Sequence, residues 1–403
     1  MRRAPRVLFV THNVPRFDGD AAGSFVLRLA VGLQALGARI QVIAPGAAGL
    51  SGTSTLEGVP IERVRYASDD RMTLAYTGNM AETVRGSWSG RVALLQLLFA
   101  TRRAVRRALA GAQREGDPFD IVHIHWWFPS GLALWKLFGR NDPARVVTMH
   151  GSDVRLAAHT KPAHPVMRAV LGEAAACTAV SSWLATTARA IAPAREITVA
   201  PMPIDDRLFD ATTNAADRRD LLFVGRLNAQ KGLADLLSAL TTSALAGTTL
   251  HVVGDGPDRE VLERQAHDTS ISQRVVWHGA LPQQALAPLY ACARAVVIPS
   301  RGEGLGLVAV EAQLCGTPVV AYADGGLLDV VREEHGGTLV EPGNIEALAG
   351  AIAQVIATDD SVVLRGTAGR KYMMARFTPR AVAEQYLGIY EAARGAGSRP
   401  LRT

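Results

Sequence analysis

Cysteine is scarce in this sequence, and the spacing of the few that occur excludes two kinds of site. The three cysteines in the 403 residues, Cys177, Cys292 and Cys315, lie far apart. They form neither the paired spacing of a zinc site nor an even-numbered disulfide framework. A reducing compartment is the expected environment of such a chain, so we predict a cytoplasmic protein.

Long apolar runs are also missing. The longest candidate, Val92–Ala100, is interrupted by Gln96 and followed by Arg102 and Arg103. The early apolar run Val7–Val10 is too short for the core of a signal peptide. Because a membrane-spanning helix needs about 20 mostly apolar residues, the sequence predicts none.

Three further motifs are absent, and their absence argues against a metal site, an oxidoreductase and a nucleic-acid-binding protein. No Asp-x-Asp pair stands in a plausible metal-binding loop, which predicts no metal site. The one Gly-x-Gly after a predicted strand, Gly254–Gly256, is followed by Pro257, which breaks the dinucleotide-binding fingerprint and argues against an oxidoreductase. No array of basic and aromatic residues indicates a nucleic-acid-binding protein.

Charge of the two signs is unevenly distributed. Residues 1–200 carry a net charge of +10 and residues 201–403 a net charge of −4. A basic first half suits an anionic acceptor or anionic lipid headgroups, although a compositional bias toward arginine explains it equally well.

One predicted helix, residues 91–114, concentrates this basic charge. Its apolar face is expected to contain Leu94, Leu98, Val105 and Leu109, and a separate stripe contains Arg102, Arg103, Arg106 and Arg107. This pattern predicts peripheral contact with an anionic membrane, expected at its inner face, and an ordinary solvated surface helix is the alternative.

Apolar runs alternate with helical spacing along both halves of the chain. In the first half, residues 23–36 have helical periodicity, and Gly37 stands where a helix commonly ends. Strands are predicted at 7–11, 40–44, 61–66, 121–124, 146–149 and 178–180, and again at 221–224, 250–253, 275–278, 295–299, 319–321 and 338–340. Strands separated by helices predict parallel sheets covered on both faces, so we expect an α/β fold with two doubly wound, Rossmann-like domains.

The join between the two domains is predicted near residues 200–206, where Pro201 and Pro203 interrupt regular structure. The first domain is expected to span 1–202 and the second 203–377. A last amphipathic helix, within residues 378–395, carries Val382, Tyr386 and Tyr390 on one side and needs a surface to cover.

Residues 301–318 are the most informative stretch. Three glycines, Gly302, Gly304 and Gly306, follow a buried strand and lead into a helix. Backbone N–H groups at such a helix start bind phosphate, and an acid just inside it is able to bind ribose hydroxyls. Glu311 holds that position, and Glu303 in the loop is expected to face a sugar ring.

Two cations mark the start of the second domain. Arg226 follows the strand 221–224, and Lys231 begins the next helix five residues later. Ligands of open α/β sheets bind at the carboxyl ends of strands, so the pair is placed to hold two phosphates. Fixed cations there would stabilise the charge of a departing diphosphate.

Taken together, these motifs resemble the retaining glycosyltransferases of family 4, which have the two-domain GT-B fold. The matching elements are Gly225-Arg226, Lys231-Gly232, Glu303 with Glu311, and Gly316-Thr317-Pro318-Val319-Val320. The resemblance implies two domains that face a central cleft, the first binding the acceptor and the second the donor. It also implies that the last helix crosses back to the first domain.

The resemblance also implies roles for individual residues. Arg226 and Lys231 would bind the donor diphosphate, Glu303 the transferred sugar and Glu311 the ribose. The remaining donor-binding positions would be Gly23, Gly256, Gly304, Leu305, Gly306 and Leu307. The donor would be a nucleotide-diphosphate sugar, and neither a metal ion nor another cofactor is implied.

In the first domain, His150-Gly151-Ser152-Asp153 resembles the His-Gly-x-Asp of the family, where the histidine lies near the reacting carbon. His150 is therefore a candidate catalytic residue, with a hydrogen-bonded structural histidine as the alternative. Trp126, Trp127 and Asp153 are candidates for acceptor binding, and packing between sheet and helix is the alternative for the aromatic residues.

The resulting prediction is a retaining hexosyltransferase that acts on a hydroxyl of a glycan or lipid-linked acceptor, in cell-surface polysaccharide or glycoconjugate synthesis. Two alternatives stay open: an epimerase-like GT-B enzyme and a non-catalytic subunit that binds sugar nucleotides. The sequence leaves the nucleotide base, the sugar and the acceptor undetermined.

Overall fold

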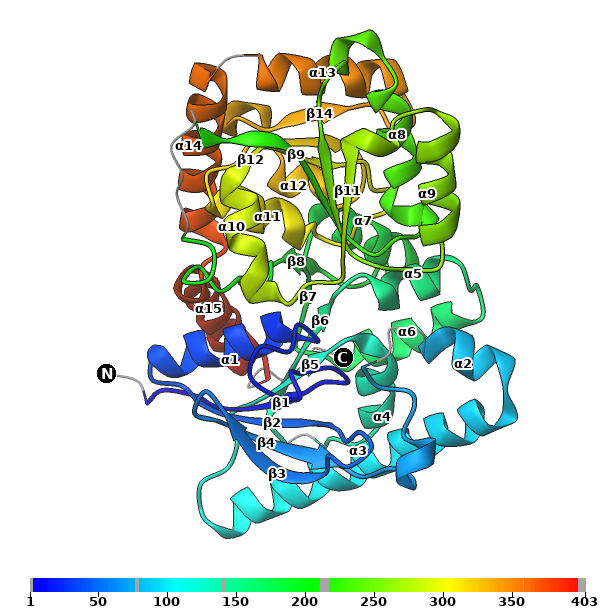
Figure 1. Cartoon of the computed structure of the whole chain (residues 1–403). Helices are drawn as coiled ribbons and strands as arrows, with labels where there is room; N and C mark the ends of the chain where they lie inside the picture. The colour runs from blue at the N-terminus through cyan, green and yellow to red at the C-terminus, as the bar shows by residue number, and fades with distance from the viewer. Residues whose placement is uncertain (1–2, 77–79, 140–141, 211–216, 358, 398–403) are drawn as a thin grey trace. The chain divides into compact units, whose positions relative to one another are not determined.

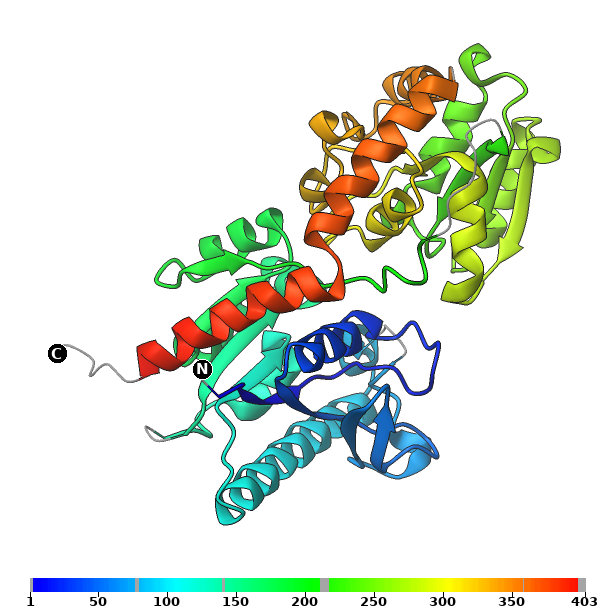
Figure 2. The same ribbon diagram turned by 90° about the vertical axis from the view of Figure 1, so that its left-hand side faces the viewer.

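The computed structural model describes residues 3–76, 80–139, 142–210, 217–357 and 359–397. The chain divides into two compact units, Met1–Pro203 with Pro379–Thr403, and Ile204–Thr378 (Figures 1 and 2). The sequence placed the division one residue earlier at both boundaries. The assignment of acceptor and donor to these units remains a proposal.

The N-terminal unit is built on one twisted sheet with the strand order β3-β4-β2-β1-β5-β6-β7-β8, as far as the described residues show. All neighbours are parallel except β3 and β4. The strands are β1 Arg6–Val10, β2 Arg39–Pro45, β3 Gly52–Leu56, β4 Val59–Val64, β5 Ile121–His125, β6 Ala144–Met149, β7 Ala176–Ala179 and β8 Ile197–Val199. The helices are α1 Ser24–Ala35, α2 Met80–Gly86, α3 Trp88–Arg114, α4 Leu132–Leu134, α5 Ser152–Ala158, α6 Ala163–Gly172, α7 Ser182–Ile191 and α15 Pro379–Gly397.

The last helix, α15, belongs to the N-terminal unit, where it packs against α1, β6 and β7 (Figure 2). Its tyrosines are buried and hydrogen-bonded. Tyr390 OH lies 2.7 Å from Nδ1 of His123, and Nε2 of His123 lies 2.7 Å from Thr148 Oγ1. Tyr386 OH donates to the Ala200 carbonyl at 3.2 Å. The expected return of the final helix onto the first domain is confirmed.

The C-terminal unit has a wholly parallel sheet with the order β11-β10-β9-β12-β13-β14 among its described residues. The strands are β9 Arg219–Val224, β10 Leu250–Val253, β11 Val275–Gly279, β12 Ala293–Ile298, β13 Val319–Tyr322 and β14 Thr338–Val340. The helices are α8 Leu233–Leu240, α9 Arg259–Asp268, α10 Leu286–Cys292, α11 Leu307–Leu314, α12 Leu327–Val330, α13 Ile345–Ile356 and α14 Asp359–Arg376.

The core of this unit explains why its strands read as continuous apolar runs. Side chains of α8, α9 and α13 pack on the sheet in a single buried cluster that includes Leu236, Val252, Val297 and Ile352. Helices α10 and α11 contact β12 as well. A strand covered on both faces has no solvent-facing residues and loses the alternation of an exposed sheet. The two doubly wound domains expected from the sequence are confirmed.

Helix α3 differs from its expected pattern. Its buried face consists mainly of small residues, Gly90, Ala93, Thr101, Ala104 and Ala112, together with Leu97 and Val105. Of the four residues expected on the apolar face, Val105 is buried, and Leu94, Leu98 and Leu109 are half-buried. The helix needs small residues because it lies close against β2, β4 and α4.

The basic stripe predicted on α3 is also divided. Arg102 donates to the carbonyls of Ala133, Trp135 and Lys136, at 3.2, 2.7 and 3.1 Å. Arg107 pairs with Glu62 at 2.8 Å. Two of the four arginines are thus engaged within the protein, and Arg103 and Arg106 are exposed.

No single helix among the described residues is both long and apolar enough to cross a membrane. One sharply bent pair, Ile345–Ile356 with Asp359–Gly395, reaches the required length and composition only when its two helices are taken together.

Candidate functional site

Two loops meet at the carboxyl edge of the C-terminal sheet. Strands β9 and β12 are parallel neighbours, so the segments that follow Val224 and Ile298 leave the sheet side by side. The Arg301 N–H donates to the Gln230 carbonyl at 2.8 Å, and the Gln230 amide donates to the Gly302 carbonyl at 3.3 Å. The loop with the two cations and the loop with the three glycines are therefore bonded to each other.

An ion pair joins these loops. Lys231 Nζ donates to Glu303 Oε2 at 2.6 Å, and the two side chains are 22% and 18% exposed. Asn228 fixes the approach of the lysine, because its side-chain oxygen accepts from the Lys231 backbone N–H at 3.2 Å. Both side chains are exposed enough to contact a ligand.

Arg226 stands at the start of the same loop, two residues after the end of β9. Its side chain is exposed, and among the described residues no side-chain hydrogen bond or ion pair holds it. Its carbonyl accepts from the Asn228 N–H at 2.9 Å, which fixes the backbone. A guanidinium anchored by its backbone and open at its tip is suited to bind a phosphate.

The glycine-rich loop ends at the start of α11. Gly306 precedes the helix with a φ of 94°, a left-handed conformation that favours glycine. Leu305 is buried, and no side chain caps the helix start. The first backbone N–H groups of α11 thus lack a side-chain partner, and such groups bind anions.

Glu311 lies one turn into α11 and is 6% exposed. Tyr290 OH donates to its Oε2 at 2.8 Å, and the Gln283 amide donates to its Oε1 at 3.0 Å. Burial raises the pKa of this carboxyl group to about 7, and the two hydrogen bonds oppose the shift. Glu311 is therefore able to gain or lose its proton near neutral pH.

Tyr290 and Gln283 were missed in the sequence. They lie 21 and 28 residues before Glu311, on α10 and just ahead of it. A second missed group braces the loop after β12: Asp235 accepts from Arg301 at 2.8 Å and from the Tyr322 hydroxyl at 2.8 Å. No local motif predicts such contacts, because the partners belong to different helices, strands and loops that lie apart in the sequence.

Gly256 has a packing role that the sequence did not reveal. A Cβ atom at this position would lie 2.3 Å from the Leu227 carbonyl oxygen. The glycine therefore allows the loop after β10 to pack against the loop after β9. This contact is sufficient to explain why position 256 is a glycine, and the expected role of Gly256 in donor binding stays a prediction.

In the N-terminal unit, aromatic rings gather where β1, β5 and β6 end. The His150 ring centroid lies 4.1 Å from that of Trp126 and 5.2 Å from that of Phe25. His150 Nε2 lies 3.1 Å from His125 Nδ1. Burial first, and the neighbouring histidines second, hold the pKa of His150 well below its ordinary value, so the ring is neutral.

The structure gives Trp127 and Asp153 a packing role, and their acceptor binding stays a prediction. Trp127 is 1% exposed, and its indole N–H donates to the Asp153 carbonyl at 2.9 Å. The Asp153 carboxylate accepts backbone N–H groups from His150, Gly151, Val154 and Trp127 at 3.0–3.1 Å. Contacts at the start of α5 therefore hold both side chains in place. Trp126 is 4% exposed, so it has no open face for stacking.

Gly23 immediately precedes α1, as expected for a glycine loop, and has a φ of 69°. A Cβ atom there would lie 2.5 Å from the Asn13 carbonyl oxygen. The close approach to the loop after β1 accounts for the glycine, and its contact with a donor stays a prediction.

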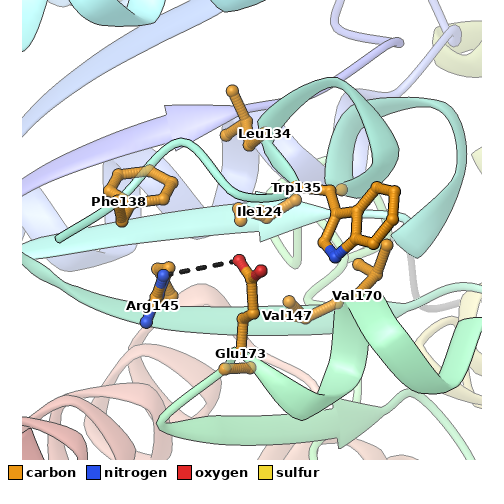
Figure 3. A pocket seen from close by; sticks show the side chains of 10 residues that line it. Ile124, Leu134, Trp135, Phe138, Arg145, Val147, Val170 and Glu173 are labelled. Atoms are coloured by element: carbon orange, nitrogen blue, oxygen red, sulfur yellow. Dashed lines mark ion pairs between the residues drawn. The ribbon is translucent and has the colours of Figure 1, made fainter.

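A small pocket in the N-terminal unit is lined by none of the candidate site residues (Figure 3). It is lined mainly by apolar side chains such as Leu134, Trp135 and Val170, and Arg145 lies 3.6 Å from Glu173 at its side. Its cavity volume of about 10 Å³ is at the lower limit for one water molecule, so it is too small for a sugar.

Comparison with known sequences covers both units. The profile of Glycosyltransferase Family 4 matches residues 22–208, and that of Glycosyl transferases group 1 matches residues 205–372. A D-inositol 3-phosphate glycosyltransferase from Xylanimonas cellulosilytica is 34% identical over 73% of this chain and 76% of its own length. A 2-deoxystreptamine glucosyltransferase from Streptomyces kanamyceticus is 30% identical over 92% of this chain and 98% of its own.

Solved structures share the fold. A sucrose-phosphate synthase from Thermosynechococcus elongatus superposes with a TM-score of 0.78 at 24% identity, covering 97% of this chain and all of the other. Anabaena HepE, crystallised with UDP, has a TM-score of 0.68 at 17% identity, covering 96% of this chain and all of the other. The matching profiles, the relatives and the fold lead to one conclusion: the chain belongs to glycosyltransferase family 4 and has the GT-B fold.

Proposed function

We propose that the chain is a retaining glycosyltransferase that moves a hexose-type sugar from a nucleotide-diphosphate sugar to a hydroxyl of a glycan or lipid-linked acceptor. It would serve the synthesis of cell-surface polysaccharides or glycoconjugates. The observation that carries the proposal is the 2.6 Å pair of Lys231 and Glu303 on the loops after β9 and β12. A cation and an acid in one site suit a ligand that has both phosphates and hydroxyls.

Each side chain has a role in donor binding. Arg226 and Lys231 are proposed to bind the diphosphate, together with backbone N–H groups of residues 304–307 at the start of α11. Glu303 would accept hydrogen bonds from hydroxyls of the transferred sugar. Glu311 would accept them from the ribose, with its orientation fixed by Tyr290 and Gln283.

The chemical step breaks the bond between the anomeric carbon and the phosphate oxygen and forms a bond from that carbon to the acceptor oxygen. The departing diphosphate gains negative charge, which Arg226 and Lys231 would stabilise. The acceptor proton would pass to the leaving phosphate oxygen, and attack on the face that the diphosphate leaves would retain configuration. A short-lived ion pair and a covalent intermediate are both compatible with this step.

His150 is proposed as the catalytic contribution of the N-terminal unit. Because its pKa is held well below the ordinary value, it would act as a neutral hydrogen-bonding group and not as a cation. Replacement by Asn keeps a polar group of similar size, whereas replacement by Ala removes it. A catalytic role predicts a larger loss of kcat for His150→Ala than for His150→Asn.

Metal independence is part of the proposal, because the two basic side chains supply the positive charge that a divalent ion would otherwise provide. Within the described ranges, no three His, Cys, Asp or Glu side chains gather as a possible ligand set. A transfer rate unchanged by a strong chelator is the expected result, and a rate restored only by added divalent ions would contradict it.

The first experiment identifies the donor. Thermal-shift measurements with UDP, GDP and ADP sugars should single out one base, because a ligand that binds only the folded state raises the melting temperature. The transfer assay then follows nucleotide release with and without acceptors. The panel should include glycans and lipid-linked sugars, and also inositol phosphate and 2-deoxystreptamine, which appear in the names of the relatives.

Matched variants separate the proposal from its rivals. Glu311→Ala is expected to lower transfer by orders of magnitude in a folded protein, while exposed Glu334→Ala, on the same unit, leaves it intact. Acceptor-independent conversion of the donor would favour an epimerase-like enzyme. Tight nucleotide binding without turnover of any donor would favour a non-catalytic subunit. Early products analysed by NMR report whether configuration is retained.

A further inference from the structure

Helix α3 exposes a line of large apolar side chains that the sequence pattern concealed. Trp88, Val92, Leu95 and Phe99 are 78%, 46%, 55% and 70% exposed. Their spacing of four, three and four residues places them on one face of the helix. Single exposed apolar residues are ordinary, but four in line over three turns of one helix form a continuous patch.

Basic side chains continue the same line. Arg103 and Arg106 lie four and seven residues beyond Phe99, so they extend the same face, and both are exposed. Near the start of the helix, the guanidinium of exposed Arg91 lies 5.5 Å from the centroid of the Trp88 ring. Residues 88–114 include six arginines and no acidic residue.

A neighbouring turn adds a second tryptophan and a lysine. Trp135 is 37% exposed, and Lys136 Nζ lies 4.8 Å from its ring centroid. Arg102 holds this turn against α3 by donating to the carbonyls of Ala133, Trp135 and Lys136. The turn therefore lies beside the helix, where Trp135 and Lys136 add a second pair of aromatic ring and cation to that of Trp88 and Arg91.

We propose that this surface, the α3 face, docks on an anionic lipid bilayer. A helix of 27 residues is about 40 Å long and is able to lie along a membrane surface. Trp88, Val92, Leu95 and Phe99 enter the boundary between headgroups and acyl chains, where tryptophan is favoured. Arg103 and Arg106 reach the phosphates of the headgroups.

The positive charge of the α3 face favours an anionic bilayer as its partner over a second copy of the chain. An interface between two identical α3 faces would bring arginine-rich surfaces together, and like charges in contact oppose association. Anionic headgroups instead neutralise the arginines while the acyl chains cover the apolar side chains. The proposal does not depend on the sugar-transfer activity, because it is tested by binding alone.

Vesicle sedimentation tests it with the full chain. Vesicles of phosphatidylcholine mixed with equal phosphatidylglycerol are compared with pure phosphatidylcholine at low ionic strength. The wild-type protein should bind the mixed vesicles and bind pure phosphatidylcholine much more weakly. Added salt should weaken the binding, because arginine–headgroup attraction is screened.

Two double variants address the two halves of the surface. Arg103→Glu with Arg106→Glu should weaken binding to the mixed vesicles by about 30-fold or more, given the typical contribution of a basic residue at an anionic surface. Trp88→Ser with Phe99→Ser should weaken it by about tenfold or more, because two inserted rings are lost. Both should keep the melting temperature, since the replaced side chains face outward.

Matched controls lie on the other unit. Leu364 is 71% exposed on α14, and Arg264 is exposed on α9. Leu364→Ser and Arg264→Glu should bind the vesicles as the wild type does. Absence of wild-type binding, or equal losses in the controls, overturns the proposal. A wild-type dimer in solution that Trp88→Ser with Phe99→Ser disrupts, without vesicle binding, overturns it in favour of self-association.

Discussion

The protonation of Glu311 predicts how donor binding depends on pH. Its pKa is raised to about 7 by burial, so the unliganded protein changes from mostly neutral to mostly charged at this position between pH 6 and pH 8. A charged carboxylate is the stronger acceptor for ribose hydroxyls, and a protonated one has lost part of its accepting capacity. Donor affinity should therefore rise as pH increases toward 7 and level off above it.

The size of the effect follows from the fraction of competent protein. At pH 6, one unit below the pKa, about one molecule in eleven carries the charge, so the apparent affinity should be about tenfold weaker than at pH 8. Expressed as free energy, this is about 1.4 kcal/mol. Titration calorimetry with the intact nucleotide sugar is the suitable assay, because the terminal phosphate of a free nucleoside diphosphate itself titrates near pH 6.

Two variants isolate the group responsible. Glu311→Gln should bind more weakly at pH 8 and lose the pH dependence. Tyr290→Phe removes a hydrogen bond that lowers the pKa of Glu311, so the affinity profile of this variant should move to higher pH. The exposed Glu334→Gln should behave as the wild type. A wild-type affinity that is constant from pH 6 to pH 8, or a Glu311→Gln profile that keeps the slope, would refute the reasoning.

Three other predictions concern catalysis and stability. Lys231→Ala should lower kcat/KM by about a hundredfold or more, because it removes a charge that stabilises the transition state. The control Lys371→Ala, at an exposed position on α14, should keep the wild-type value, and equal rates of the two variants in a transfer assay would contradict the role of Lys231. Tyr390→Phe leaves a buried nitrogen of His123 without its partner and should lower the free energy of unfolding by about 1–3 kcal/mol, measured in urea. Burial lowers the pKa of His123 in the folded protein, whereas an exposed histidine in the unfolded chain has a pKa of about 6.5. The contribution of His123 to stability is therefore present above about pH 6.5 and is lost as the pH falls toward the pKa of the folded protein. A His123→Gln variant should lose less stability than the wild type between about pH 6.5 and 5, and an equal loss would contradict this prediction.

The sequence predicted the framework of the fold because that framework depends on local patterns. The strands predicted at 250–253 and 338–340 have those bounds in the structure, and the helix predicted within residues 23–36 is Ser24–Ala35. Buried parallel strands are continuous apolar runs, and helices keep a 3.6-residue period, so both are visible within a short window.

The missed elements have physical reasons. Strand β3, Gly52–Leu56, is a largely exposed edge strand of Gly, Ser and Thr with little hydrophobic signal. Its antiparallel pairing with β4 was not predicted either. On α3, small residues form the buried face and large apolar ones face outward, which reverses the usual pattern.

The candidate site was predictable only where its residues stand in motifs. Lys231 and Glu303 occur in recognisable strand-to-helix loops, and the structure pairs them. Gln283 and Tyr290 support Glu311 from another element, and no spacing in the sequence indicates this contact. Trp127 looked available for stacking because the sequence does not reveal the buried contact between its indole N–H and Asp153.

A structure of the chain with the nucleoside diphosphate chosen by the thermal-shift screen is the most direct measurement of the donor site. The account predicts phosphate oxygens within hydrogen-bonding distance of Lys231 Nζ and the Arg226 guanidinium, and ribose hydroxyls on Glu311. A diphosphate bound elsewhere, with Lys231 still paired only to Glu303, would contradict it.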